Sequence, residues 1–316
     1  MRAYVHVGMP KAGSTAIQLS LATCKADLLR THGIYYCPSD SKFQNDFDIY
    51  CAHKGRRRSL VHDLLFARQR AAADLGAKKI VFSCERFFEI AENPDEFAEF
   101  IRHFEEMFEG SLEFVVVYRG LRSFIKSHAT QLLYNGGITY GNMGLAFWIV
   151  RMLKAHYDLP FKVNFLNYDL AKRDACLYGK FLELVSGQRC HEKERYENIT
   201  PPRPLAYAAI LGQICKLESL FQSADINSPE IDSVRDSINQ RFDQLWLSGA
   251  ERKEEREILD TLSRALDDRI EKYADLSIKR LDDPGRAFLE KLGSSMIVEN
   301  GYDTKLRSHE RAVAAR

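Results

Sequence analysis

The sequence predicts an α/β protein, a three-layer sandwich with a central parallel sheet and a helical extension toward the C-terminal end. Three observations support this prediction. Short apolar runs alternate with stretches of helical periodicity up to about residue 200. The run at 112–118, Leu-Glu-Phe-Val-Val-Val-Tyr, is almost continuously apolar, as is typical of a strand buried on both faces. Beyond about residue 200 only helical patterns continue.

The expected elements follow in order along the chain. A strand over 4–7 leads into a helix over 14–30, which Gly33 would end, and a short extended piece over 34–37 comes next. The remaining elements of the first part are helices over 59–76, 94–108, 121–134 and 145–157, and strands over 79–83, 112–118 and 161–166. Right-handed crossovers should connect the parallel strands.

The last third of the sequence is expected to be helical. Helices are predicted over 205–221, 230–247 and 251–281. The segment 249–280 is highly charged with few apolar anchors, which is typical of a solvated long helix or a helical hairpin. We therefore expect residues 1–204 to form the α/β core and residues 205–316 a helical extension packed on it within the same domain. The charged segment could also serve homo-oligomerisation, and the sequence does not decide this.

The composition is that of a globular protein without a strong overall field. The 316 residues are 45% hydrophobic and 28% charged, with a net charge of +1. This balance gives no reason to expect nucleic acid or a membrane surface as a partner, so any anion site must be local. Seven scattered cysteines without a Cys-x-x-Cys pair are typical of free thiols in a reducing compartment. With no signal peptide or transmembrane run recognisable, we expect a cytoplasmic location.

The turn after the first strand has the composition of an anion-binding loop. It reads Gly8-Met9-Pro10-Lys11-Ala12-Gly13-Ser14-Thr15 and lies between a strand and a helix. The glycines allow a tight turn and close approach to a ligand, and the helix start presents unpaired N–H groups. Lys11 adds a positive charge. In a Walker A loop the lysine directly follows the second glycine, whereas here it lies inside the loop.

The segment from His6 to Gln18 resembles the 5′-phosphosulfate loop of sulfotransferases that use 3′-phosphoadenosine 5′-phosphosulfate (PAPS), in the wording of bacterial and carbohydrate-type members. The resemblance implies a fold like that of the P-loop NTPases. It also implies that Lys11 binds the 5′-phosphate and the bridging oxygen, and neutralises charge as the sulfuryl group leaves. The loop residues implied to bind the cofactor with it are Pro10, Ala12, Gly13, Ser14 and Thr15.

A second anion site is expected where the strand over 112–118 ends. Arg119 follows this strand and Ser127 comes eight residues later, a spacing that resembles the 3′-phosphate site of the same family. Arginine suits this task because its planar fork forms two parallel bonds to phosphate. The family often has Asn-Pro after the arginine, whereas this chain has Gly120-Leu121-Arg122. Arg122 is therefore either an auxiliary phosphate contact or an exposed helix residue.

Sulfuryl transfer to a hydroxyl needs a positioned base for the acceptor proton. Glu85 is the first candidate, because it follows a buried-type strand and Ser83-Cys84-Glu85 resembles the Ser-Ser-Glu stretch of many bacterial members. It could instead be a carboxylate that interacts with a helix dipole. His53 is the second candidate, in a region where acceptor contacts are common in the family, or else a surface or structural histidine. Asp46 and Asp48 are further candidates.

These features lead to the hypothesis of a PAPS-dependent sulfotransferase that needs no metal and acts on a hydroxyl or amine of a carbohydrate or glycoconjugate. The stretch over 165–169 resembles a strand followed by Tyr-Glu in the family, and the Gly- and Tyr-rich loop over 134–141 could form a lid. One alternative is a small-molecule kinase with a divergent loop, which would need an acidic metal partner. The other is a non-catalytic nucleotide-binding relative. The sequence names neither the acceptor nor the oligomeric state.

Overall fold

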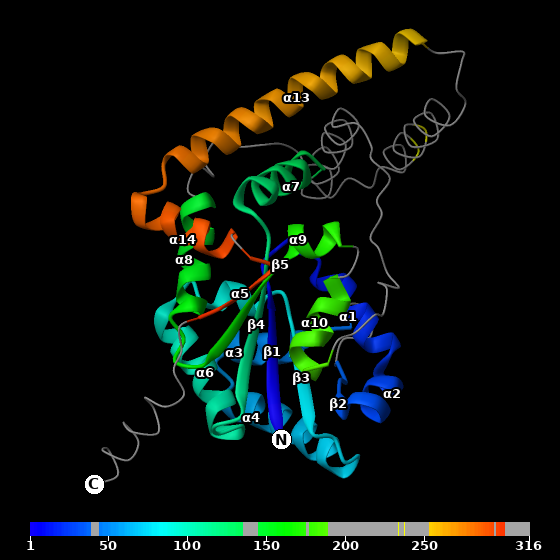
Figure 1. Ribbon diagram of the computed structural model, residues 1–316, viewed down its shortest axis with the longest axis vertical. Helices are drawn as coiled ribbons and strands as arrows, with labels where there is room; N and C mark the ends of the chain where they lie inside the picture. The colour runs from blue at the N-terminus through cyan, green and yellow to red at the C-terminus, as the bar shows by residue number, and fades with distance from the viewer. Residues whose placement is uncertain are drawn as a thin grey trace. The chain divides into compact units, whose positions relative to one another are not determined.

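The structure is a computed structural model, and it describes residues 1–38, 44–134, 145–174, 177–188, 253–293 and 295–300, with single positions at 233 and 237. The chain divides into two compact units. The sheet unit comprises residues 1–120, 148–198 and 282–316, and the helical unit comprises residues 121–147 and 199–281. Each unit is described by itself, with the elements labelled in Figure 1.

A six-stranded, mostly parallel sheet forms the centre of the sheet unit, which confirms the α/β class. The strands are β1 (Arg2–Gly8), β2 (Ile34–Tyr35), β3 (Lys79–Ser83), β4 (Leu112–Tyr118), β5 (Lys162–Asn167) and β6 (Ile297–Glu299). Their order is β2-β3-β1-β4-β5-β6, and only β6 is antiparallel to its neighbour. In the centre of the sheet, Val5 of β1 lies opposite Phe82 and Phe114.

Helices cover both faces of this sheet (Figure 1). One face carries α1 (Ser14–Thr23), α9 (Tyr168–Arg173) and α10 (Leu177–Ser186), and the other carries α3 (Phe47–Lys54), α4 (Arg58–Asp74), α5 (Phe87–Ile90), α6 (Pro94–Met107) and α8 (Leu145–Tyr157). The connection from β1 to β2 runs through α1 on one face. The later connections, from β2 to β3, β3 to β4 and β4 to β5, run in the other direction across the sheet and use the opposite face. This arrangement is the one that right-handed crossovers require. The helix α14 (Asp283–Gly293) leads into β6, and its Phe288 ring packs on Tyr157 of α8.

Alternating residues of the strands build a core on each face. His6 points toward α10, where its ring meets Phe181 edge-on with centroids 5.0 Å apart. Phe82 points to the opposite face and packs against Phe104, with centroids 5.3 Å apart, in an aromatic cluster that includes Phe87 and Phe100. All these side chains are buried, and burial of such large apolar surfaces is the main stabilising contribution to the sheet unit.

The structure differs from the predicted elements in several places. The helix expected over 14–30 breaks at Cys24 and continues as α2 (Lys25–Asp27) and the π-helical turn η1 (Leu28–His32), before Gly33 ends it with a φ of 62°. The helices α3, α5, α10 and α14 were not predicted. The expectation that no strand follows residue 200 is wrong, because β6 joins the sheet edge. A strand of three residues shows too little periodicity to be recognised.

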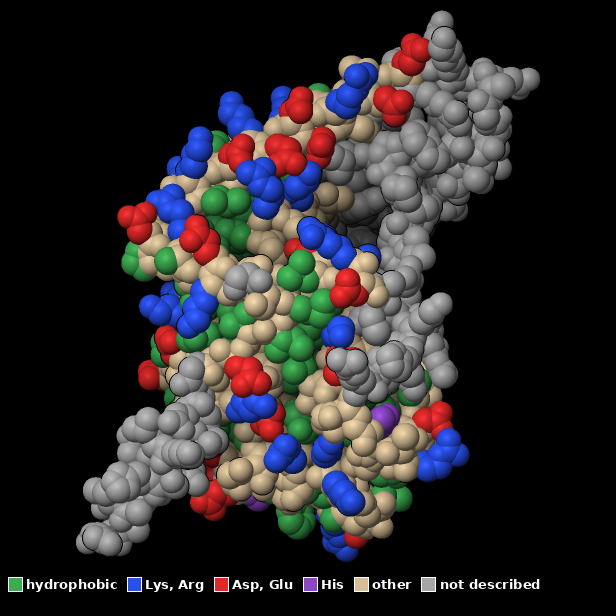
Figure 2. Space-filling view, in the orientation of Figure 1, with side chains coloured by type: hydrophobic (Ala, Val, Ile, Leu, Met, Phe, Trp, Pro, Cys, Tyr) green, Lys and Arg blue, Asp and Glu red, His purple; other side chains and the backbone are tan. Residues whose placement is uncertain are grey.

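The helical unit contains α7 (Leu121–Tyr134) and α13 (Lys253–Lys279), which confirms a single long helix within the charged segment. Arg122 of α7 is ion-paired with Glu271 at 2.7 Å and with Asp275, and Lys126 is also paired with Glu271. Acidic and basic side chains are mixed along the visible face of α13 (Figure 2). Arg122 is thus an exposed helix residue held by acidic partners in its own unit.

Several predictions fall outside the described residues. These are the helices over 205–221 and 230–247, and the candidate lid beyond Tyr134. Within the ranges that the structure does describe, no helix has both the length and the apolar character needed to cross a bilayer.

Candidate active site

The sheet topology brings two predicted anion-binding segments together at one edge of the sheet. The chain leaves β1 toward β2 on one side, and it leaves the neighbouring strand β4 toward β5 on the other side. In open α/β sheets, the carboxyl ends of two strands whose connections diverge in this way form the usual ligand crevice. The turn at Gly8–Thr15 follows β1 and Arg119 follows β4, so both lie at this point.

The turn after β1 has the backbone geometry of an anion cradle. Its start is tied to β4 by a hydrogen bond from Met9 N–H to Val117 O at 2.8 Å. Lys11 and Gly13 both adopt positive φ values, 64° and 81°, which reverse the chain twice. Among the described residues, the backbone N–H groups of residues 11, 13, 14 and 15 donate to no backbone carbonyl. Successive free N–H groups at a helix start form a concavity that binds anions.

Ser14 sits at the floor of this turn with an unsatisfied hydroxyl. The side chain is 2% exposed, and its Oγ has no hydrogen-bond partner in the described part of the chain. A Cβ atom placed on Gly8 would lie 1.6 Å from this oxygen, so only glycine fits at the end of β1. His6 Nε2, which is also buried and without such a partner, lies 3.8 Å from the same point. Buried polar atoms left unpaired in this way are uncommon and call for a bound partner.

Arg119 lies directly beside the turn and is held from three sides. Its Nη1 donates to the carbonyl oxygen of Lys11 at 3.3 Å, and its Nε lies 3.4 Å from Asp169 Oδ1. The guanidinium stands over the ring of Tyr168, 5.1 Å from the centroid. Asp169 Oδ2 also accepts the N–H of Gly120 at 2.8 Å, which ties the end of β4 to the start of α9. The structure therefore brings the predicted 3′-phosphate arginine to the predicted 5′-phosphate loop.

The start of α9 packs against the turn, a contribution that the sequence signalled only weakly. Asn167 caps this helix by accepting the N–H of Asp169 at 3.0 Å. A Cβ atom on Gly13 would lie 2.8 Å from Tyr168 Cε2 and 2.6 Å from Leu177 Cδ2. Glycine at this position allows both side chains to approach the turn. Tyr168 and Asp169 thus belong to the site through their contacts with Arg119 and Gly13.

Glu85 lies two residues beyond β3 on the same edge of the sheet. Its side chain is partly buried, and burial raises the pKa of the carboxyl group, while the nearby charge of Lys11 lowers it by a smaller amount. The first candidate base is therefore within electrostatic range of the loop lysine. A carboxylate with a raised pKa is a better proton acceptor than an ordinary one.

His53 is packed between α3 and α6. It is 6% exposed, and its ring meets Phe100 edge-on, with centroids 5.3 Å apart, and lies 6.1 Å from the ring of His103. Burial lowers the pKa of His53, and the neighbouring His103 lowers it further. These contacts match the structural alternative considered for this histidine, a neutral ring that fills space between two helices.

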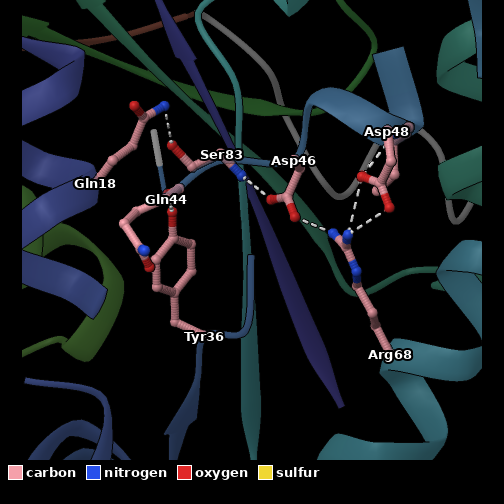
Figure 3. A network of polar contacts seen from close by, with 8 residues as sticks. Gln18, Tyr36, Gln44, Asp46, Asp48, Arg68 and Ser83 are labelled. Atoms are coloured by element: carbon pink, nitrogen blue, oxygen red, sulfur yellow. Dashed lines mark hydrogen bonds and ion pairs between the residues drawn. The ribbon is translucent and has the colours of Figure 1, made fainter. Parts of the chain in front are cut away.

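Ser83, the last residue of β3, is the centre of a buried polar network (Figure 3). Its Oγ shares a hydrogen bond with His6 Nδ1 at 2.7 Å and accepts one from Gln18 Nε2 at 3.1 Å. Burial lowers the pKa of His6 to about 3, so this histidine is neutral at physiological pH. The network joins β1, α1 and β3 directly beneath the turn and fixes the strand end that precedes Glu85.

Asp46 continues this network toward α4 (Figure 3). Its Oδ2 accepts the N–H of Ser83 at 2.5 Å, and its other oxygen is paired with Arg68. The same guanidinium contacts both oxygens of Asp48 at 2.9 Å. Burial raises the pKa of Asp46 to about 6, and the charge of Arg68 limits this rise. Both further base candidates are therefore engaged by one arginine, which holds the start of α3 in place.

Two other expectations concern Ser127 and metal binding. Ser127 lies on α7 in the helical unit, and its part in binding a 3′-phosphate stays a prediction. Within the described ranges, no group of three or more His, Cys, Asp or Glu side chains is arranged to hold a metal ion.

Comparisons of the chain with protein-family models, with curated protein sequences and with solved structures found no match. What the site binds is therefore inferred from its own geometry and from the resemblance of its motifs.

Proposed function

We propose that the protein is a sulfotransferase that moves a sulfuryl group from PAPS to a hydroxyl or amine of a carbohydrate-type acceptor. The observation that carries this proposal is the meeting of two groups suited to anions at one edge of the sheet. The free N–H groups of the turn and the guanidinium of Arg119 lie side by side, with Nη1 3.3 Å from the carbonyl oxygen of Lys11. A nucleotide with anionic groups on both its 3′ and 5′ oxygens requires two such neighbouring sites.

The chain offers distinct groups for the two ends of this donor. The N–H groups of the turn, with the hydroxyls of Ser14 and Thr15, would bind the 5′-phosphosulfate. The unsatisfied Ser14 Oγ would gain a partner on binding. Arg119, stacked on Tyr168 and oriented by Asp169, would bind the 3′-phosphate with little loss of side-chain freedom, because its position is already set.

In the transfer step, the acceptor oxygen or nitrogen bonds to sulfur while the bond between sulfur and the 5′-phosphate oxygen breaks. The two events must lie in line, which is a matter of positioning. The ammonium group of Lys11 would stabilise the negative charge that develops on the leaving phosphate oxygen. The carboxylate of Glu85, within electrostatic range of this lysine, would accept the proton of the acceptor.

The main alternative is a kinase that uses ATP with Mg²⁺. Glu85 follows a strand beside the turn and could in that case contribute to a metal site. The position of the lysine argues against this alternative, because residue 14, where a Walker A loop carries its lysine, is a serine here. The two functions differ in the nucleotide bound and in the need for a metal.

Titration calorimetry with 3′-phosphoadenosine 5′-phosphate and with ATP plus Mg²⁺ tests the proposal. We expect the 3′,5′-bisphosphate to bind at least about tenfold more tightly, a difference of about 1.4 kcal/mol. Transfer from PAPS to an acceptor panel should persist in EDTA and be abolished in Lys11→Ala. Tighter binding of Mg-ATP would refute the sulfotransferase assignment. Bisphosphate binding without transfer to any acceptor would favour the non-catalytic relative.

A further inference from the structure

We infer that the acceptor binds in a subsite formed by α3, α5 and the start of α6, and that this subsite selects a saccharide without anionic groups. The inference rests on the proposed function and deepens it by naming the acceptor class. The acceptor subsite consists of the aromatic pair Phe47 and Tyr50 together with an adjoining groove. The groove is lined by Lys54, Glu89, Glu92, Asn93, Pro94 and Glu96.

The aromatic pair presents a flat apolar surface at the start of α3. Phe47 is 40% exposed, and its ring stacks on that of Tyr50 with centroids 5.6 Å apart and an interplanar angle of 22°. Residues three apart on a helix share one face, so the helix itself sets this arrangement. An amphipathic ring with one exposed face suits a ligand that is apolar on one side and polar at its edge, as a sugar ring is.

This surface begins at the same sheet edge as the candidate base. The N–H of Asp46 donates to Ser83 O at 2.9 Å, and Asp46 Oδ2 accepts the N–H of Ser83 at 2.5 Å. Phe47 is the next residue after Asp46, and Glu85 comes two residues after Ser83. The double hydrogen bond therefore sets the start of the aromatic pair beside the strand end that carries the base.

An arginine–glutamate pair connects the base to the aromatic pair. Arg86 Nη1 contacts both carboxylate oxygens of Glu89, at 2.7 and 2.8 Å. Burial raises the pKa of Tyr50, Glu89 raises it further and Arg86 lowers it. The same two charges act on the carboxyl of Glu85. Arg86 directly follows Glu85 in the chain, and Glu89 lines the groove together with Lys54, which shares a face of α3 with Tyr50. The Arg86–Glu89 pair therefore connects Glu85 to the groove and offers donors and acceptors to ligand hydroxyls.

The adjoining groove has the size and charge for an uncharged or cationic saccharide. It is open to solvent and has a volume of about 480 Å³, within the range of about 300–1,000 Å³ usual for small-ligand sites. Its lining holds three carboxylates and one ammonium; Lys54 is paired with Glu96 at 2.6 Å, and Glu89 is paired with Arg86. The carboxylate of Glu92 is then the charge in excess, and together with the two paired carboxylates it would disfavour a uronate or a sulfated sugar, whereas neutral hydroxyls or an ammonium group meet acceptors.

Three tetrasaccharides test this specificity by calorimetry on the full chain, with and without 3′-phosphoadenosine 5′-phosphate. They are an N-acetylglucosamine tetramer, its de-N-acetylated cationic form and a tetragalacturonate. We expect the neutral and cationic tetramers to bind about tenfold or more tightly than the anionic one. Phe47→Ala and Tyr50→Ala should each weaken saccharide binding by about three- to tenfold and leave nucleotide affinity unchanged. Phe66→Ala, which removes a 51% exposed ring on α4, is the matched control and should change neither affinity.

Equal or tighter binding of the tetragalacturonate would overturn the inference. So would binding that Phe47→Ala and Tyr50→Ala leave unchanged, or an absence of binding by all three tetramers. The two ideas can fail separately. If the bisphosphate nucleotide does not bind, the proposed function is refuted. The saccharide titrations without nucleotide then still decide whether the subsite binds the acceptor.

Discussion

The ion pair between Asp46 and Arg68 should be essential for stability, because it joins the start of α3 to β3 and α4. Asp46 is 1% exposed and the Arg68 side chain 12% exposed, so both charges are largely removed from water. The change Asp46→Ala would leave the N–H of Ser83 without its acceptor and the guanidinium with Asp48 as its remaining carboxylate among the described contacts. Breaking a buried pair from one side destabilises a protein by about 3–5 kcal/mol.

We expect the lower end of this range, about 3 kcal/mol, because Asp48 still contacts the guanidinium through both oxygens. The midpoint of thermal unfolding should fall by about 6 °C or less, because the shift is about 2 °C per kcal/mol for a protein of about 250 residues and becomes smaller as the chain becomes longer. Urea titration followed by circular dichroism measures the free energy directly, provided that the transition is two-state.

A second variant and a control separate this explanation from a general sensitivity of the region. In Asp46→Ala/Arg68→Met the unpaired charge is also removed, and stability should partly recover relative to the single variant. Glu99→Ala removes the partner of the exposed Arg58, whose side chain is 66% exposed, and should cost at most about 1 kcal/mol. The reasoning is refuted if Asp46→Ala costs no more than this control, or if the double variant is less stable than Asp46→Ala.

Three further predictions concern the site. Arg119→Ala should weaken binding of the bisphosphate nucleotide by about 2–3 kcal/mol in calorimetry, because a charge-assisted bond is lost. Arg122→Ala is the control, because it removes ion pairs that lie within the helical unit, and it should leave nucleotide affinity unchanged. Equal effects of the two variants would contradict the assignment. The transfer rate should fall as pH decreases through the pKa of Glu85, which burial raises above its ordinary value, because a base must be ionised to accept a proton. Glu85→Gln should remove most of the activity together with this acidic limb of the pH profile. An unaltered pH profile in that variant would place the base elsewhere. Gly8→Ala should lower the unfolding midpoint and nucleotide affinity together, because the added methyl group would lie 1.6 Å from Ser14 Oγ; wild-type values for both would show that the turn has another conformation.

The strands of the sheet and the cradle could be predicted because their signals are local. The apolar runs at β1, β3, β4 and β5 are bounded by polar or glycine residues, and each was expected within a few residues of its observed bounds. The free N–H groups of the turn likewise follow from a strand, two glycines and a helix start in close succession. Each of these features depends on residues near one another in the sequence.

Other elements could not be predicted because their stability comes from partners far away in the chain. The strand β6 has three residues and exists through its pairing with β5, more than a hundred residues earlier, as in the register Phe165 to Val298. The helix α3 begins where Asp46 bonds to Ser83, a contact between residues 37 positions apart. Neither segment shows enough periodicity of its own to identify its structure.

By itself, the sequence determined which chemical groups the chain places in its first turn and at the end of its strongest strand. Only the tertiary structure decided which of these groups meet. Strand order brings Arg119 to Lys11 and gives it Asp169 and Tyr168 as partners, whereas packing between α3 and α6 encloses His53. The physical reason is that backbone propensity acts over a few residues, while pairing of strands and burial of side chains depend on the whole chain closing around one core.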